Sequence, residues 1–179
     1  MAETREPEKA KLFVGMISGF PETFVEATGI LQERFSAVDT ESEIFPFDCT
    51  DYYESEMGKN LKRKFVAFEP LISQEELAQI KIFTNSVEKK FAGKYSLSRP
   101  VNLDPGLVLS SKIILASCKD FSHRIYLRKG VWAEVTLQFH KGSYKTLPWT
   151  YPDFIKEDYH SFFLEVRKKF LEQLRQSMK

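Results

Sequence analysis

The residue types that could do chemistry gather in SHRIYLRKGVWAEVTLQF (residues 122–139), a stretch typical of a β-hairpin. Arg124 is a cation that can bind an anionic group, and Glu134 is a carboxylate that can act as an acid or a base. Tyr126 and Trp132 carry rings that can stack on a planar ligand. If the four side chains share one face of the hairpin, they form a polar and aromatic surface suited to a small ligand.

The register of the hairpin decides which side chains share a face. A two-residue turn would pair Arg128 with Val131, whereas a three-residue loop ending at Gly130 would pair Leu127 with Val131. We prefer the second register because it sends the apolar residues of both strands to one buried face, and because glycine readily adopts the left-handed conformation. The other face then carries three cross-strand pairs: Arg124 with Glu134, Tyr126 with Trp132, and Ser122 with Thr136.

Two interpretations of these pairs remain open. In the first, the face binds a ligand, and the neighbouring Lys119 and His123 complete the site. In the second, Arg124 and Glu134 are an ordinary ion pair on a solvated or covered face of the sheet, beside an ordinary aromatic pair. A cross-strand pair contributes about 0.2–1 kcal/mol on its own, so neither pair by itself requires a functional explanation.

A second candidate lies in NLDPG (residues 102–106). Asp-Pro-Gly is typical of a type I or type II turn, and a turn is the preferred interpretation of this segment. Asn102 and Asp104 are two residues apart, so they would point to the same side if a strand runs up to the turn. They would then present a carboxamide and a carboxylate, and Asp104 could transfer a proton.

Two aromatic segments are further candidates. WTYPDF (residues 149–154) places Trp149 and Tyr151 just before a predicted helix, where the segment either starts that helix or forms a lid over a binding face. In TDYYESEMG (residues 50–58), two tyrosines and Glu56 either line a pocket or simply close a loop.

The sequence contains no complete catalytic motif. It has no GxGxxG, GxxxxGK[ST] or GxSxG pattern, and its three histidines lack the spacing of a zinc site. We therefore predict no metal site and name no cofactor. Whether the protein is an enzyme stays open at this point.

Composition and charge indicate one globular domain. The chain has 179 residues, is 42% apolar and contains 16 Phe, which is enough for a folded core. Its 26 basic and 25 acidic residues argue against a surface devoted to nucleic acid. The charge is uneven, because residues 39–58 hold seven acids and no base while residues 112–145 hold seven bases and two acids. Cys49 and Cys118 are expected to be buried, reduced thiols.

The predicted location is the cytoplasm, without a membrane contact. The N-terminal sequence MAETREPEKAK is polar and lacks the apolar core of a secretory signal. No apolar run approaches the roughly 18 residues of a membrane span.

The hydrophobic pattern predicts an α+β fold. We expect a flexible tail over residues 1–10 and a single domain over residues 11–179. Elements in the order β-α-β-β-α-β match a ferredoxin-like core, which the hairpin 122–139 and a long C-terminal helix extend. The sheet is expected to be antiparallel or mixed, with helices mainly on one face. The expected elements are strands at 11–18, 43–50, 62–72 and 112–118 and helices at 21–36 and from Ser73 to Gly93, the latter opened by a Ser73–Glu76 capping box.

The ordered motifs NLDPG, KDFSHRIYL, AEVTLQF and WTYPDF, preceded by YYESEMG, resemble an uncharacterised bacterial family, the domain of unknown function numbered 4416. The resemblance covers about residues 10–175. It implies a small cytosolic bacterial protein, and it supplies no catalytic residues to carry over.

Three functions follow as hypotheses. The first is binding, with or without turnover, of a phosphate-bearing small molecule or nucleotide, in which Glu134 or Asp104 transfers protons. The second is a module for single-stranded nucleic acid such as RNA, which the near-zero net charge disfavours. The third is a non-catalytic interaction protein that forms a homodimer. The predicted ligand-binding residues are Asn102, Lys119, His123, Arg124, Tyr126, Trp132, Thr136, Trp149 and Tyr151.

Overall fold

The central strand of the structure is β1 (Ala10–Ser18), all of whose nine residues are buried. It pairs with β4 (Lys62–Ile72) on one side and with β5 (Asn102–Val108) on the other. Successive side chains of a strand point to opposite faces, so a strand that is buried throughout requires cover on both faces of the sheet. Within residue 1 and residues 3–177, which this computed structural model describes, the sheet has nine strands.

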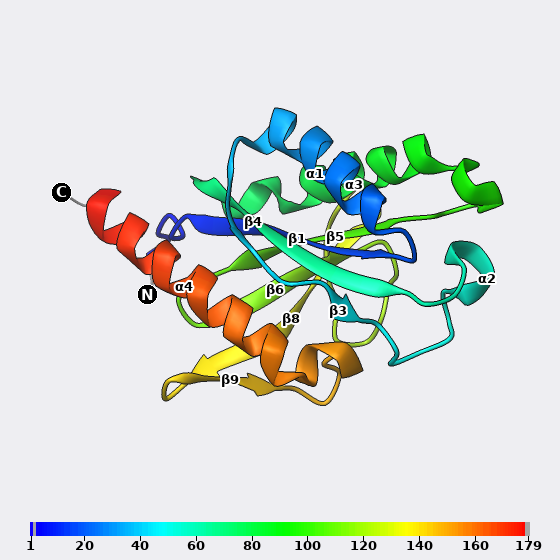
Figure 1. Cartoon of the computed structure of the whole chain (residues 1–179). Coiled ribbons are helices and arrows are strands. Elements are labelled where there is room, and N and C mark those ends of the chain that lie inside the picture. The colour runs from blue at the N-terminus through cyan, green and yellow to red at the C-terminus, as the bar shows by residue number, and fades with distance from the viewer. Residues whose placement is uncertain (2, 178–179) are drawn as a thin grey trace.

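The other strands extend this sheet toward two edges (Figure 1). At one edge, β2 (Val38–Glu41) and β3 (Phe45–Pro46) pair with β4. Pro46 thus lies in an edge strand, as expected of a residue that cannot donate a backbone hydrogen bond. All strand pairs among the described residues are antiparallel. Of the two predicted alternatives, an antiparallel or a mixed sheet, the first is therefore confirmed. Beyond β5 the sheet continues through β6 (Lys112–Ser117), β8 (Val131–His140) and β7 (Ile125–Arg128), with β9 (Ser143–Thr146) also on β8.

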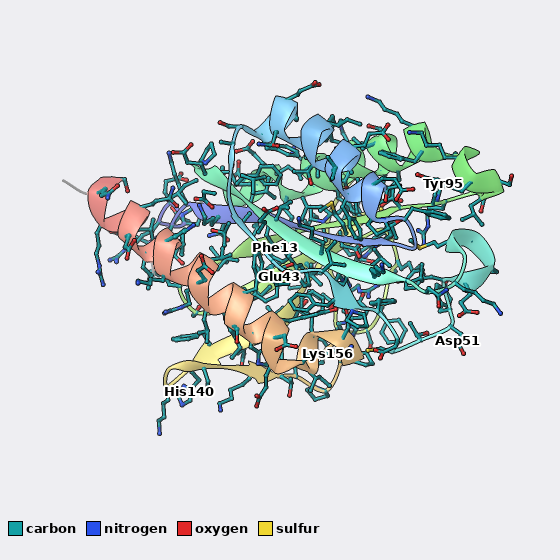
Figure 2. All side chains as sticks on the ribbon, viewed as in Figure 1. Phe13, Glu43, Asp51, Tyr95, His140 and Lys156 are labelled. Carbon is teal, nitrogen blue, oxygen red and sulfur yellow. The ribbon has the colours of Figure 1, made fainter. Side chains whose placement is uncertain are left out.

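Helices cover both faces of the sheet, which corrects the expectation that they lie mainly on one. α1 (Pro21–Phe35) and α3 (Leu77–Phe91) lie on one face, and the long C-terminal helix α4 (Glu157–Ser177) crosses the other (Figure 1). The reason is the alternation in β1. Phe13, labelled at the centre of Figure 2, packs with residues of α4, whereas its neighbours Leu12 and Val14 pack with residues of α1 and α3.

Local sequence signals place the helices of the first face correctly. Pro21 occupies the first turn of α1, where its missing N–H is not needed. The Ser73–Glu76 capping box is present and opens a 3-10 turn that leads into α3. The segment after β3 forms one short helix, α2 (Glu54–Met57).

NLDPG is a strand and not a turn, so the preferred interpretation of this segment is wrong. Asp104, Pro105 and Gly106 pair with β1 through Gly15, Val14 and Phe13 respectively. Pro105 lacks the N–H that pairing on both sides would use, and the pairing with β6 begins only at Gly106. A Cβ atom at Gly106 would collide with the Phe13 ring and the Ile114 carbonyl oxygen, so only glycine fits there.

The hairpin turn is shorter than predicted, although most of its register is correct. Lys129 and Gly130 form a two-residue turn with positive φ angles of 52° and 73°, and Arg128 pairs with Val131. A shift at Leu127 then restores the predicted pairing of Tyr126 with Trp132. The predicted pair of Ser122 and Thr136 does not form, since β7 begins at Ile125. The predicted buried face also fails on β7, because this edge strand is exposed throughout.

In the part of the chain that the structure describes, none of the helices combines the length and apolar character needed to span a membrane. The predicted tail and domain include residue 2 and residues 178–179, which lie outside the described residues. Glu8, within the predicted tail, accepts hydrogen bonds from the backbone N–H and the hydroxyl of Ser110.

Candidate functional site

The sheet opens between β5 and β6. The two strands pair only from Gly106 and Leu115 to Val108 and Ile113, so residues 102–105 of β5 and 116–117 of β6 are not paired with each other. A cavity of about 910 Å³, here called the sheet-split cavity, lies at this opening. The loop between β3 and α2, the loop after β6 and the 3-10 helix Pro152–Ile155 supply other parts of its lining. Its volume falls within the usual range for small-molecule sites.

Arg63 of β4 is the most deeply buried cation in this lining, with 4% of its surface exposed. Its Nη2 donates to Asp153 Oδ2 at 2.7 Å. The rings of Phe47, Phe65 and Phe154 surround its guanidinium at 5.2–5.6 Å. Burial alone would lower the pKa of Arg63, but Asp153 and a second carboxylate raise it, so the group stays charged. Its Nε and Nη1 have no hydrogen-bond partner among the described residues.

Asp104 of β5 is the second carboxylate beside Arg63, at 3.7 Å from Nη1. It accepts hydrogen bonds from Asn102 and, at 3.2 Å, from Lys81 Nζ. Burial alone would raise the pKa of Asp104, but Lys81 and Arg63 outweigh this effect and lower the pKa below its usual value. Asp104 is therefore an ionised carboxylate held between two cations, with Asn102 on the same side as predicted for a strand.

Lys81 reaches this site from α3, on the other face of the sheet. Lys81 is only 6% exposed. Its ammonium group donates to the Leu103 carbonyl oxygen at 2.9 Å, in addition to Asp104. An ammonium group has three donors, so these two contacts leave one for a ligand. The gap between β5 and β6 is what allows a side chain of α3 to line the sheet-split cavity.

Other titratable groups of the lining respond to burial. Burial raises the pKa of Tyr53 to about 12, and the charge of Asp104 acts in the same direction. Burial also raises the pKa of Glu88, whose carboxylate accepts the Leu103 backbone N–H at 2.7 Å. Tyr53 lies under the guanidinium of Arg99 at 5.5 Å. These side chains connect the charged end of the cavity to its rim.

The predicted pair of Arg124 and Glu134 exists, but it supports the cavity wall. Arg124 donates to Glu134 Oε2 at 2.8 Å, to Ser117 Oγ at 3.0 Å and to the Tyr151 hydroxyl. Glu134 is 3% exposed and also contacts His123 Nε2 at 3.0 Å. Burial and the charge of Glu134 raise the pKa of Tyr151. This network fixes Arg124 and Tyr151 at the cavity, with Glu134 behind them.

The structure brings some predicted residues together and separates others. Thr136 is buried, and its hydroxyl points to Glu134 Oε1 at 3.4 Å. Trp149 stacks on His123 at 5.1 Å. Tyr126 and Trp132 form an edge-to-face pair at 5.3 Å. The predicted residues that line the sheet-split cavity are Asn102, Asp104, Lys119, Arg124 and Tyr151. Those outside its lining are His123, Tyr126, Trp132, Glu134, Thr136 and Trp149.

Sequence reasoning missed Arg63, Lys81 and Asp153, although two of them left a signal. Lys81 follows Leu77 by four residues and precedes Thr84 by three, so it occupies the buried stripe of α3. Arg63 alternates with Phe65 on β4, on the face that points inward. A charged residue in an apolar stripe is rare and often has a function. Asp153 gave no such sign, because its partner lies 90 residues away.

The two cysteines are not buried, which corrects the expectation. Cys118 is exposed and accepts a contact from Asn85 Nδ2 at 3.2 Å, while Cys49 is half-buried. Both line the sheet-split cavity. Across the described ranges, 1 and 3–177, no group of three or more His, Cys, Asp and Glu side chains is placed to hold a metal ion.

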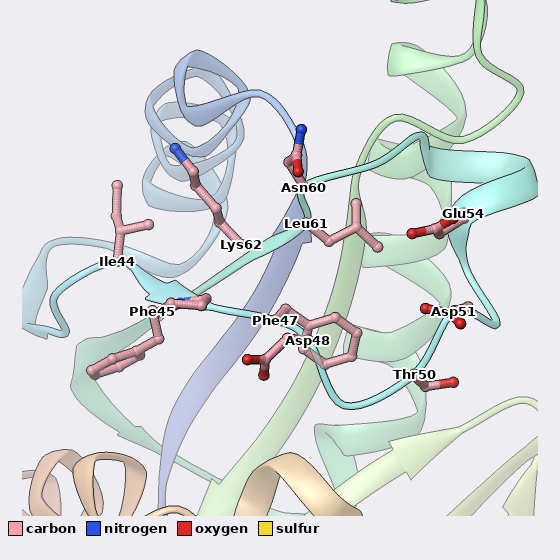
Figure 3. A pocket seen from close by; sticks show the side chains of 11 residues that line it. Ile44, Phe45, Phe47, Asp48, Thr50, Asp51, Glu54, Asn60, Leu61 and Lys62 are labelled. Carbon is pink, nitrogen blue, oxygen red and sulfur yellow. The ribbon is translucent and has the colours of Figure 1, made fainter.

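A second cavity of about 650 Å³, here called the edge cavity, lies beside β3 (Figure 3). Its apolar lining includes Phe45, Phe47 and Leu61, and Phe47 is shared with the sheet-split cavity. Its acidic residues are Asp48 and Asp51 on the loop after β3 and Glu54 at the start of α2, all labelled in Figure 3.

Comparison with known proteins gives one match that covers most of the chain. No curated protein and no solved structure is significantly similar to it. A family model described as a domain of unknown function, DUF4416, matches residues 8–170 of the 179 residues. The chain therefore belongs to the DUF4416 family.

Proposed function

We propose that the sheet-split cavity binds a small molecule that carries a phosphate group, a phosphorylated metabolite or a nucleotide. The observation that carries this proposal is Arg63, a buried guanidinium with two nitrogens that lack a partner among the described residues. A buried donor left without a partner costs about 1–3 kcal/mol. The protein covers Nε and Nη1 of Arg63, so a ligand oxygen would relieve this cost once the side chain shifts toward the cavity that it lines.

The charge of the lining also supports an anionic ligand. Lys81 has a donor left beside Arg63, and Lys119 lies at the rim. Phosphate oxygens are strong acceptors, and charge-assisted hydrogen bonds to them are about twice as strong as neutral ones. The lining holds six basic residues against four acidic ones: Arg63, Lys81, Lys89, Arg99, Lys119 and Arg124 against Glu88, Asp104, Asp120 and Asp153.

For turnover of such a ligand, Asp104 is the better placed of the two predicted carboxylates. It lines the cavity, and its lowered pKa keeps it ionised near pH 7. The unprotonated carboxylate could accept a proton, but the lowered pKa makes it a weak general base. Glu134 lies outside the lining and is held by Arg124 and His123. We assign Glu134 to positioning Arg124 and Tyr151, and not to contact with the ligand.

A thermal-shift screen against phosphorylated metabolites and nucleotides tests the proposal. A ligand at a hundred times its Kd stabilises a protein by about 2.7 kcal/mol, which raises the Tm by about 5–10 °C for a chain of this size. Arg63→Lys keeps a positive charge for Asp153 but loses the guanidinium, so it should lose most of the shift. Arg175→Lys, the same substitution on the exposed end of α4, should keep it. The proposal fails if no compound shifts the Tm, or if R63K and R175K respond alike.

A second candidate function has one observation in its favour, an apolar edge strand. Ile125 is 71% exposed and Leu127 is 40% exposed on β7, whose outer side pairs with no strand of the described chain. Such an edge can pair with a second copy of the chain. Light scattering at high concentration would show a dimer, and Ile125→Lys would abolish it; a monomer at all concentrations would exclude the homodimer.

The platform for single-stranded nucleic acid is less well supported. Helices cover both faces of the sheet (Figure 1). Tyr126 and Trp132 form an aromatic pair on β7 and β8, at one edge of the sheet. Binding of single-stranded RNA that weakens as the salt concentration rises would support this nucleic-acid-binding function.

We also propose a ferredoxin-like core for the fold and a bacterial, cytoplasmic origin for the protein. The strand order β2-β4-β1-β5 supports a ferredoxin-like core, because the chain runs β1-α1-β2-β4-α3-β5 apart from the short elements β3 and α2 between β2 and β4. The family resemblance described above supports a bacterial, cytoplasmic protein.

A further inference from the structure

Two aromatic side chains of the sheet-split cavity are largely exposed. Tyr52, on the loop between β3 and α2, is 64% exposed, and Phe121, on the loop between β6 and β7, is 63% exposed. Both line the cavity. A single exposed aromatic residue needs no explanation, but two exposed rings from separate loops in the lining of one cavity give a ligand two apolar surfaces to contact.

Contacts at the rim hold both rings in place. Lys119 Nζ donates to the Tyr52 hydroxyl at 2.9 Å and lies 4.6 Å from the centre of its ring, so it joins the two loops. Tyr53 packs edge-on against Tyr52 at 5.0 Å. Phe121 packs against His123 at 5.3 Å. Stacking on a side chain that is already positioned costs little conformational entropy, which favours binding.

The size of the cavity also exceeds what a phosphate group needs. The sheet-split cavity measures about 910 Å³, close to the upper end of the range for drug-sized ligands. The buried cations Arg63 and Lys81 lie at one part of its lining, next to Asp104. A ligand that fills the cavity therefore has a further part beyond the group that these cations bind.

We propose that this further part is a flat ring, and that Tyr52 and Phe121 contact the ring while Arg63 and Lys81 contact the phosphate. The ligand class is then a phosphate ester of a ring compound, and a nucleoside monophosphate is its simplest representative. The inference rests on the proposed function, because it assumes that the cavity binds phosphate. It adds that the rings of Tyr52 and Phe121 determine which phosphate-bearing compounds the cavity binds.

Isothermal titration with three probes separates the two proposals: adenosine 5′-monophosphate, ribose 5-phosphate and inorganic phosphate. The wild-type protein should bind the nucleotide at least about tenfold more tightly than ribose 5-phosphate, because stacking on aromatic side chains contributes at least about fivefold per ring. Tyr52→Ala and Phe121→Ala should each weaken nucleotide binding about fivefold or more and leave ribose 5-phosphate unchanged.

Conservative variants and an external control complete the design. Tyr52→Phe and Phe121→Tyr keep a ring and should keep nucleotide affinity. Ile155→Ala, an exposed apolar residue outside the cavity lining, should change nothing. Equal binding of the nucleotide and ribose 5-phosphate by wild type and alanine variants would overturn the ring inference alone. If none of the three probes binds, or if Arg63→Lys leaves their binding intact, the proposed function itself is wrong.

Discussion

The two cavities of this molecule differ in where their charges lie. In the sheet-split cavity, Arg63 and Asp153 are each about 95% buried and form an ion pair at 2.7 Å. In the edge cavity, Asp48 pairs with Lys156 at 2.8 Å, but its side chain is 73% exposed. Taking charges out of water is costly, whereas a surface ion pair forms at almost no cost. A buried, incompletely paired charge is therefore much stronger evidence for a binding site than a row of surface carboxylates.

The comparison also explains why the edge cavity is a weaker candidate for a binding site. Figure 3 shows Asp48 and Asp51 on the loop after β3 and Glu54 at the start of α2, in the acidic stretch that the sequence revealed. Lys156 lowers the pKa of Asp48, and Asp48 raises that of Lys156, as in any surface pair. Among the residues that the structure describes, the buried side-chain nitrogens and oxygens without a hydrogen-bond partner belong to Arg63, Arg99 and Tyr159, and none of these lines the edge cavity.

The largest expected effect is on stability at the sheet-split cavity. Asp153→Ala leaves Arg63 buried with no close hydrogen-bonded carboxylate, and loss of one partner of a buried pair typically costs about 3–5 kcal/mol. Urea denaturation should show this loss in the free energy of unfolding. Asp48→Ala, the matched change at the edge cavity, should give no measurable change. Equal effects of the two variants would contradict the distinction between the cavities.

The next effect is the pH dependence that Asp104 gives to stability. Its pKa is lowered in the folded state, so it stabilises the fold above its unfolded pKa of about 3.9, and this contribution disappears as the pH falls through the lower folded value. Asp104→Asn should cost about 1.5–3 kcal/mol at pH 7, the usual value of a charge-assisted hydrogen bond. The gap between wild type and D104N should narrow below about pH 4. A gap that stays constant from pH 7 to pH 3 would show that Asp104 is not held as an anion.

A third effect concerns the opening of the sheet itself. At Gly106, where the pairing of β5 with β6 begins, a methyl group would meet the Phe13 ring and the Ile114 carbonyl oxygen. Gly106→Ala should therefore destabilise the protein by about 1–3 kcal/mol, the usual cost of overpacking. Gly29→Ala in α1, where the added methyl group meets nothing, should instead stabilise by up to about 1 kcal/mol. Thermal denaturation of both variants checks the signs, and a stable G106A would mean that the strands can separate there.

Sequence reasoning succeeded where the deciding contacts are local. The helix from Pro21 and the Ser73–Glu76 capping box depend on residues within a few positions, and both are present. The pairing of Tyr126 with Trp132 was also predictable, because a hairpin brings together neighbours in the chain. The turn at Lys129 and Gly130 was misjudged because a bulge at Leu127 compensates for a shorter turn.

The prediction failed where partners are far apart in the chain. Local propensity favours a turn at Asp104, Pro105 and Gly106, but pairing with β1, some ninety residues earlier, holds them in a strand. The ion pair of Arg63 and Asp153 spans 90 residues and joins β4 to the segment before α4. The sequence therefore indicated five of the 27 residues that line the cavity, without showing the cation around which the proposed site is built. These five are Asn102, Asp104, Lys119, Arg124 and Tyr151.

The smallest expected effect tests the edge cavity from its basic side. Lys156 Nζ donates to Asp48 Oδ1 at 2.8 Å and to the Pro46 carbonyl oxygen at 3.3 Å. The side chain of Lys156 is 33% exposed and that of Asp48 is 73% exposed. Lys156→Met should change the free energy of unfolding by no more than about 0.5 kcal/mol, because solvent and salt screen such a pair. The change should shrink further between 0.05 and 0.5 M NaCl. A loss of several kcal/mol, or a loss that salt leaves unaltered, would mean that the edge cavity also depends on a desolvated charge. The edge cavity would then be as strong a candidate for a binding site as the sheet-split cavity.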